Sequence, residues 1–244
     1  MAERLRVQVN RLLLVVLFLL GLPLIVAAER IRRGSGQLVA LRVLRTGARL
    51  TGVRIVTRSQ VEPPGDRPVI LVPNHSSPLD IAALVLAYPE IRFVAAADLY
   101  RIPLLRGAMR ALGTVPVDRH RPRQGRQDLL ALVASGAPPL LAIFPEGGIP
   151  PAGRRRPFKT GAFALAIDTG ALVVPVAIRG TAELLPPGAA FGLRPGEVTV
   201  ALLDPIDTFG LGPHDRRTLR DRAQSAVLVE LGCPPLELEG VETA

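Results

Sequence analysis

Short apolar runs rich in β-branched residues alternate along this chain with segments that repeat apolar side chains at helical spacing. The run at 69–72 stops at Pro73, and a polar turn then leads into a helix-like segment at 79–88. Further strands are predicted at 53–57, 91–96, 114–117, 139–144, 171–178 and 198–203, and further helices at 103–112, 124–135, 160–169 and 215–231. Strands that alternate with helices predict the α/β class, with a mostly parallel central sheet flanked by helices.

An uncharged run of 17 residues, 12–28, precedes this region and is interrupted by Gly21 and Pro23. As a helix it would be about 26 Å long, slightly short for a hydrocarbon core of about 30 Å. Arginines flank both ends: Arg4, Arg6 and Arg11 precede the run, and Arg30, Arg32 and Arg33 follow it. The run predicts either a narrow membrane span or a helix that lies in one leaflet with both flanks on the same side. A cleaved signal peptide is the competing interpretation, but the run exceeds the usual apolar region of about 7–15 residues, which favours a retained anchor.

The segment 37–50 combines leucines at three-residue steps with arginines spaced three and four residues apart. Its leucines include Leu38, Leu41 and Leu44, and its arginines are Arg42, Arg45 and Arg49. This spacing predicts an amphipathic helix that lies against a bilayer. The alternative is a surface helix that packs on the globular domain.

The positive charge is concentrated in the amino-terminal arm. The net charge is +9, and residues 1–58 account for all of it with eleven arginines against Glu3 and Glu29. Because these arginines surround an apolar run with little aromatic content, the arm predicts contact with an anionic membrane surface and not with nucleic acid. The single cysteine, Cys233, excludes an internal disulfide framework, and no pair of the three histidines has metal-ligand spacing, so we expect no metal site.

The polar turn after residue 73 carries a histidine and an aspartate five positions apart, His75 and Asp80. Five residues of continuous helix would rotate these side chains by about 500°, onto different faces. They can meet if His75 lies at the strand end and Asp80 in the first helical turn, where a carboxylate is electrostatically favoured. A neutral imidazole could then take a proton from a hydroxyl while the carboxylate fixes its tautomer. Spacing alone favours the simpler interpretation, in which the histidine lies in a turn and the aspartate caps a helix.

Three further stretches follow along the chain. Residues 113–119 end a strand on an arginine, residues 144–148 read Phe-Pro-Glu-Gly-Gly, and residues 173–178 form an apolar strand that contains a proline. Sites in parallel α/β sheets lie beyond the carboxyl ends of the strands, so the turns after residues 72, 117 and 144 are expected to converge.

Taken in order with Asn74, His75 and Asp80, these stretches resemble the lysophospholipid acyltransferase family, whose best-known members are the 1-acyl-sn-glycerol-3-phosphate acyltransferases. The resemblance covers residues from about 53 to 203, together with the amino-terminal anchor. It implies that His75 is the general base that deprotonates the acceptor hydroxyl and that Asp80 orients it. The hydroxyl would attack the acyl thioester directly, which agrees with the lack of a nucleophile motif in the sequence.

The resemblance also implies substrate-binding positions. Arg119 would grip an acceptor phosphate, Glu146 would bond a glycerol hydroxyl or fix its loop, and Gly147 and Gly148 would offer N–H donors to an anion. Lys159 is the only lysine in the chain and is expected to face the site. The remaining positions are Asn74 and Ser76, on either side of His75. The alternatives are a surface charge for Arg119, a structural turn at 146–148 and a helix-entry charge for Lys159.

One departure from the family pattern concerns the acceptor. Members that act on lysophosphatidic acid usually continue the glutamate-glycine turn with threonine and arginine, whereas this chain has Gly148 and Ile149. Either an arginine at 154–156 supplies the phosphate contact in place of that residue, or the acceptor lacks a terminal phosphate monoester.

We therefore expect a membrane anchor with an amphipathic helix at 1–50, an acyltransferase domain at 51–233 and an acidic tail at 234–244. The expected reaction transfers a fatty acyl chain from an acyl thioester co-substrate, acyl-CoA or acyl-ACP, to lysophosphatidic acid or a related lysolipid in phospholipid biosynthesis, with no cofactor. The expected location is the cell membrane, with the active site on the cytoplasmic side. The alternatives are the same fold acylating an amino-acid-derived lipid or a glycolipid, and a non-catalytic lipid-binding protein.

Overall fold

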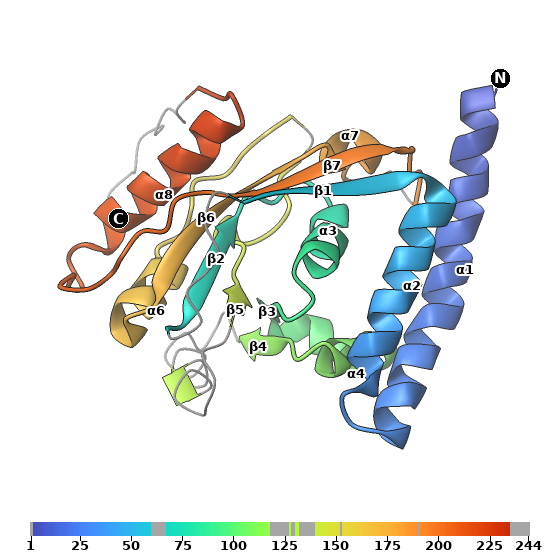
Figure 1. Cartoon of the computed structure of the whole chain (residues 1–244), viewed down its shortest axis with the longest axis horizontal. Helices are drawn as coiled ribbons and strands as arrows, with labels where there is room; N and C mark the ends of the chain where they lie inside the picture. The colour runs from blue at the N-terminus through green and yellow to red at the C-terminus, as the bar shows by residue number, and fades with distance from the viewer. Residues whose placement is uncertain are drawn as a thin grey trace.

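The computed structural model describes residues 2–59, 67–117, 127, 130–131, 140–151, 153–189 and 191–234. Within these ranges, seven strands form one sheet in the order β1-β7-β6-β2-β5-β3-β4 (Figure 1). The strands are β1 (Val53–Ser59), β2 (Val69–Pro73), β3 (Arg92–Ala96), β4 (Val115–Val117), β5 (Leu140–Ala142), β6 (Leu172–Arg179) and β7 (Gly196–Leu202). The helices are α1 (Ala2–Ile31), α2 (Ser35–Thr51), α3 (Leu79–Ala87), α4 (Pro103–Ala111), α6 (Gly161–Thr169), α7 (Thr181–Leu184) and α8 (Arg216–Glu230), with a 3-10 helix η1 (Ala97–Arg101).

The α/β class predicted from the sequence is confirmed, and the sheet is mixed. Every neighbouring pair of described strands is parallel except β6 and β7, which are antiparallel. Since β1 is parallel to β7, both strands run against the other five. The alternation of strands and helices along the sequence predicts mostly parallel pairing, which five of the six described pairs have, but it does not reveal where the direction reverses.

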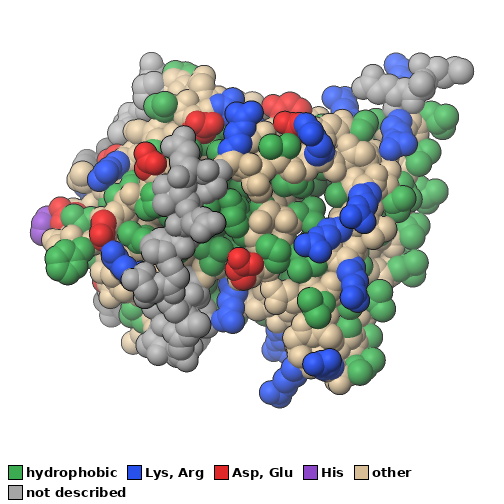
Figure 2. All heavy atoms as spheres, in the orientation of Figure 1, with side chains coloured by type: hydrophobic (Ala, Val, Ile, Leu, Met, Phe, Trp, Pro, Cys, Tyr) green, Lys and Arg blue, Asp and Glu red, His purple; other side chains and the backbone are tan. Residues whose placement is uncertain are grey.

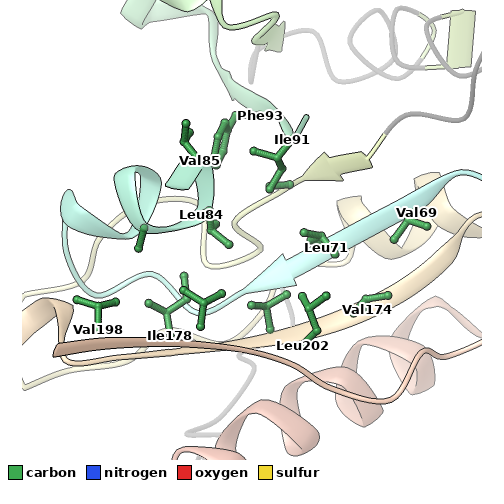
Figure 3. Close-up of a cluster of buried hydrophobic side chains, with 14 of the residues drawn as sticks. Val69, Leu71, Leu84, Val85, Ile91, Phe93, Val174, Ile178, Val198 and Leu202 are labelled. Carbon is green, nitrogen blue, oxygen red and sulfur yellow. The ribbon is translucent and has the colours of Figure 1, made fainter. Parts of the chain in front are cut away.

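β2 lies at the centre of the sheet, and all five of its residues are buried. Val69 and Leu71 point to one face, where they pack with α3 side chains such as Leu84 (Figure 3). Ile70 and Val72 point to the other face and pack with residues of α6 and α8. Because successive side chains of a strand alternate between faces, helices on both sides explain why the run is continuously apolar.

Pro175 lies inside β6 and leaves the pairing of that strand intact. The antiparallel ladder with β7 covers 176–179, so Pro175 lies one residue beyond it. The Pro175 carbonyl accepts the N–H of Leu203 at 3.0 Å, so it faces the side of β7. Because the nitrogen and the carbonyl of one strand residue point to the same side, the Pro175 nitrogen also faces that side. The missing N–H of the proline therefore falls where the ladder has already ended.

α1 and α2 form a helical hairpin at one end of the molecule (Figure 1). α1 has 30 residues and passes through Pro23 without ending. Asn10 fastens its inner face, because the fully buried amide donates to the carbonyls of Thr51 at 3.0 Å and Leu193 at 3.1 Å. Further along, Ile25 is buried in a cluster with residues of α2 and α4.

α2 confirms the helix predicted at 37–50 and packs one face on the rest of the domain. Ala40 and Leu41 are buried on that face, while the arginines of α2 are exposed. Gly52 ends the helix in the left-handed conformation, with φ of 75°. Helices α4, α6 and α8 lie where the sequence predicts them. Most of the helix predicted at 124–135, and residues 235–244 of the predicted tail, lie outside the described residues.

Candidate functional site

The turn that follows β2 places His75 and Asp80 side by side at the carboxyl end of the central strand. His75 comes two residues after the strand, and Asp80 lies in the first turn of α3. Pro73 ends the strand, and Pro78 directly precedes the helix. The positive end of the helix dipole favours the carboxylate at this position.

His75 Nδ1 lies 2.9 Å from Asp80 Oδ2, so the structure brings the two residues together as the resemblance implied, although spacing alone favoured two separate roles. The same carboxylate oxygen accepts the backbone N–H groups of Ser76 at 2.7 Å and Ser77 at 2.9 Å. Asp80 is fully buried, and His75 is 8% exposed. Because the carboxylate oxygen is the acceptor, Nδ1 carries a hydrogen, and in the neutral ring Nε2 then keeps its lone pair. The arrangement therefore provides a base with a fixed tautomer.

Phe144 fixes the plane of the imidazole ring. The two rings are stacked, with centroids 3.9 Å apart and planes at 21°. Phe144 follows β5, which pairs with β2 in the sheet. The Phe144 ring also stacks on the ring of Phe93 of β3, with centroids 6.3 Å apart. His75 is thus held by a hydrogen bond at one edge and by an aromatic face, which orients Nε2.

Glu146 ties the turn after β5 to the turn after β2. Its Oε1 accepts the backbone N–H of His75 at 2.8 Å, and its Oε2 accepts the backbone N–H of Arg156 at 3.4 Å. The side chain is 4% exposed, and this burial raises the pKa of the Glu146 carboxyl above its usual value, against the opposing effect of the two N–H groups. Both oxygens bond backbone, so the contacts correspond to the loop-fixing role among the two expected for Glu146.

Gly147 makes room for the side chain of Lys159. Its φ is 74°, and a Cβ added there would lie 2.8 Å from Lys159 Nζ. The Lys159 backbone N–H donates to the Pro145 carbonyl at 2.9 Å, which holds the lysine over the turn. A cation therefore lies beside the glycine turn, 12 residues after Gly147 in the sequence. Gly148 has φ of 150°, and a Cβ there would lie 3.8 Å from Arg156 Nη1.

A cavity of about 350 Å³ opens beside the histidine turn. Its lining residues come from three segments: Ser76 from the turn, Pro150, Pro151, Gly153 and Arg154 from the loop after β5, and Ala182, Glu183, Pro186 and Pro187 from α7 and the following loop. Ser76 Oγ lies 3.1 Å from the Thr181 hydroxyl at the start of α7. Among the described lining residues, Arg154 is the cationic side chain and Glu183 the anionic one.

Both polar atoms of the Asn74 side chain bond the backbone of β6. Its Nδ2 donates to the Ile178 carbonyl at 3.0 Å, and its Oδ1 accepts the Ile178 N–H at 2.8 Å. The side chain thereby extends the pairing of β2 with β6 by one step and holds the start of the turn. Arg119 lies outside the described residues.

Three contacts of the site were not anticipated from the sequence: the Phe144 stack, the Thr181 hydroxyl and the Glu183 carboxylate. Phe144 stands directly before the Pro-Glu-Gly turn, and Thr181 directly after Gly180, the glycine between β6 and α7. Because β5 and β6 are the two neighbours of β2, residues at their ends are the natural candidates to touch His75. The spatial order of strands was the missing signal.

Comparison with known proteins identifies the family. The profile of the family described as Acyltransferase matches residues 49–179. A chloroplastic 1-acyl-sn-glycerol-3-phosphate acyltransferase of Brassica napus is 32% identical over 81% of this chain and 58% of its own length. A 1-acyl-sn-glycerol-3-phosphate acyltransferase of Chlamydomonas reinhardtii is 35% identical over 91% of this chain and 65% of its own length. The chain thus spans less than two thirds of these relatives.

A solved structure shares the fold. The crystal structure of the 1-acyl-sn-glycerophosphate (LPA) acyltransferase PlsC from Thermotoga maritima superposes with a TM-score of 0.74 at 23% identity, covering 98% of this chain and 100% of that one. The profile match covers more than half of the chain and includes the histidine turn, the glycine turn and Lys159. The chain therefore belongs to the Acyltransferase family.

Proposed function

We propose that this protein is an O-acyltransferase that moves a fatty acyl group from a thioester to the hydroxyl of lysophosphatidic acid or a related lysolipid. The observation that carries the proposal is the buried His75–Asp80 pair, with 2.9 Å between Nδ1 and Oδ2, next to a cavity of about 350 Å³. The names of the relatives from Brassica and Chlamydomonas support this class of acceptor.

In the proposed reaction, His75 Nε2 takes the proton of the acceptor hydroxyl while the hydroxyl oxygen attacks the thioester carbonyl carbon. A C–O bond forms, the C–S bond breaks, and the departing sulfur takes the proton back from the imidazolium. The products are an ester and a free thiol, and His75 is regenerated. Asp80 Oδ2 stabilises the imidazolium while it exists, because the carboxylate is already hydrogen-bonded to Nδ1. Either acyl-CoA or acyl-ACP satisfies this chemistry as the donor.

The cavity wall supports two acceptor classes. The Arg154 guanidinium is a forked donor that suits a phosphate, and it is one of the three arginines at 154–156 that offer a phosphate contact in place of the one missing at Ile149. Glu183 on the same wall suits a hydroxyl or an amine. An amino-acid-derived lipid or a glycolipid is therefore the second candidate acceptor. Parallel assays with lysophosphatidic acid and an acceptor without phosphate distinguish the two.

Membrane association is part of the proposal, with the cell membrane and its cytoplasmic side as the location. α1 contains a 28-residue segment, Arg4–Ile31, that is long and apolar enough to cross a membrane. Its inner face is fixed to the domain by Asn10 and Ile25, whereas Leu5, Leu12 and Leu20 are each at least 65% exposed. Figure 2 displays hydrophobic side chains along the edge formed by α1, with basic side chains beside them over α2. This division favours a helix that lies in the plane of the interface with its arginines toward anionic headgroups.

His75→Ala tests the chemistry, with His214→Ala as the matched control because the His214 side chain is 85% exposed and bonds to Asp215 on the surface. Both variants, purified in full length, would be given lysophosphatidic acid with acyl-CoA or acyl-ACP, and the acylated product would be measured by mass spectrometry. We expect loss of product with His75→Ala and normal turnover with His214→Ala. Near-normal turnover by a folded His75→Ala protein would remove the proposed mechanism.

A further inference from the structure

The imidazole of His75 lies flat against the phenyl ring of Phe144. The centroids of the two rings are 3.9 Å apart, and their planes meet at 21°. An aromatic face attracts a cation whose charge lies within about 6 Å of the ring centroid. A positive charge on the imidazole would therefore lie well inside this range.

The phenyl ring is held in place from the protein core. Phe93 of β3 stacks on Phe144, with centroids 6.3 Å apart and planes at 11°, and is itself 6% exposed. Phe93 belongs to the core cluster that contains Val85 and Ile91 (Figure 3). Because β2, β5 and β3 are successive neighbours in the sheet, the three rings follow one another across it. Phe144 thus presents its face to His75 from a fixed position.

The electrostatics of this stack depend on the charge of the imidazole. The face of a phenyl ring carries negative potential, so it attracts an imidazolium but gains little beyond dispersion from a neutral imidazole. His75 is buried, so little water screens this attraction. The described charged groups in contact with His75 are the carboxylates of Asp80, at Nδ1, and Glu146, at the backbone N–H. Phe144 contacts the imidazole by its face instead.

We propose that Phe144 stabilises the imidazolium that forms when His75 Nε2 takes the proton of the acceptor hydroxyl, and that it thereby lowers the barrier to acyl transfer. The attraction appears with the charge and ends when the proton passes to the departing sulfur, so it favours the transition state over the neutral ground state. Phe144 is a positioning residue that acts through His75 and makes no bond to the substrate. The inference rests on the function proposed above, in particular on proton transfer to His75.

Fluorinated phenylalanines at position 144 test this stabilisation with little change in packing. Fluorine is close to hydrogen in size and withdraws electron density from the ring face, so one, two and three fluorines weaken the attraction stepwise. Each full-length protein would be assayed with lysophosphatidic acid vesicles and with acyl-CoA or acyl-ACP. We expect kcat to fall at each step, reaching a loss of about 5- to 30-fold with three fluorines. KM should not change, because Phe144 is not among the described residues that line the cavity.

Phe163 of α6 is the matched control position. It is fully buried and stacks on Phe158, with centroids 6.5 Å apart and planes at 22°, in a cluster of apolar side chains. The same fluorinated residues at position 163 should leave kcat unchanged. Phe144→Leu removes the aromatic face and keeps an apolar side chain, so its loss of kcat should match that of the trifluorinated residue. Thermal unfolding by circular dichroism compares the folding of all these proteins.

A kcat that does not change with fluorination at position 144 would overturn the inference and leave the proposed function in place. An equal fall at position 163, or a fall that follows the unfolding temperature and not the number of fluorines, would also overturn it. Absence of acyl transfer by the wild type, or normal turnover by His75→Ala, would overturn the proposed function together with the inference, because no imidazolium would then form.

Discussion

Replacing Asp80 by asparagine removes one charge from the site and keeps the shape of the side chain. Asp80 Oδ2 accepts three hydrogen bonds, from His75 Nδ1 and from the backbone N–H groups of Ser76 and Ser77. An asparagine must place its carbonyl oxygen at this point, because its NH2 group would face three donors there. The NH2 group then takes the place of Oδ1, a buried atom without a hydrogen-bond partner in the described part of the chain. The tautomer of His75 is therefore preserved in Asp80→Asn.

The variant loses the attraction between the carboxylate and the imidazolium that forms when Nε2 takes the proton. With charge centres about 4 Å apart and an effective dielectric constant of about 20, this attraction is about 4 kcal/mol. A barrier higher by about 4 kcal/mol lowers kcat about 10³-fold. His75→Ala removes the base itself, so its loss should be larger than that of Asp80→Asn.

Release of free thiol from acyl-CoA, with lysophosphatidic acid in vesicles, measures both variants against the wild type. Asp221→Asn is the matched control, because this aspartate lies on the exposed side of α8 and bonds only its neighbour Arg220 among the described residues. Thermal unfolding by circular dichroism verifies that each variant is folded. A kcat of Asp80→Asn within tenfold of the wild type would show that no imidazolium forms beside the carboxylate. A loss as large as that of His75→Ala would show that the tautomer is not preserved.

Three further predictions follow from buried or strained positions. Burial raises the pKa of Glu146, so the wild type should lose stability relative to Glu146→Gln as the pH rises from the usual carboxyl pKa through the raised one. Urea unfolding of both proteins at about pH 4 and about pH 7 measures this difference. The opposite trend would mean that the hydrogen bonds to Glu146 outweigh its burial. Gly147→Ala should lower the free energy of unfolding by about 1–2 kcal/mol and displace Lys159. Gly161→Ala, where a Cβ meets nothing within 4 Å, should leave that free energy unchanged or raise it. Equal unfolding midpoints of the two variants would contradict this. Asn10→Ala leaves two backbone carbonyls without their donor and should lower the free energy of unfolding by about 1–3 kcal/mol. Thermal unfolding measures this loss as a fall of about 2–4 °C in Tm per kcal/mol. An unchanged Tm would show that the amide does not hold α1.

The pairing of His75 with Asp80 could be anticipated because it is local. A proline ends the strand, another precedes the helix, and five residues then suffice to bring the imidazole to the carboxylate. The glycine turn could likewise be placed at a strand end. The turns after residues 72 and 144 were expected to converge, and they do, but the atoms that touch depend on β5 being the neighbour of β2, which the order of strands along the chain does not reveal.

Long-range features escaped prediction for a related reason. The reversal of β1 and β7 depends on how the sheet is assembled, and α7, with four residues, is too short to show periodicity. The Asn74 amide bonds to β6, a strand about 100 residues away in the sequence, so its role in holding the turn becomes apparent only when β2 and β6 are neighbours.

A series of hydrogen bonds connects α1 to the histidine turn. Asn10 bonds the end of α2 and the loop before β7, and that loop begins at the carbonyl that accepts the Ser77 hydroxyl. Ser77 in turn donates its backbone N–H to Asp80, the partner of His75. A helix attached by a flexible linker would leave the height of the imidazole above the bilayer undefined. Here the bonds of Asn10 and Ser77 fix α1 relative to the histidine turn, so the membrane association proposed above would hold His75 at one distance from the lipid surface.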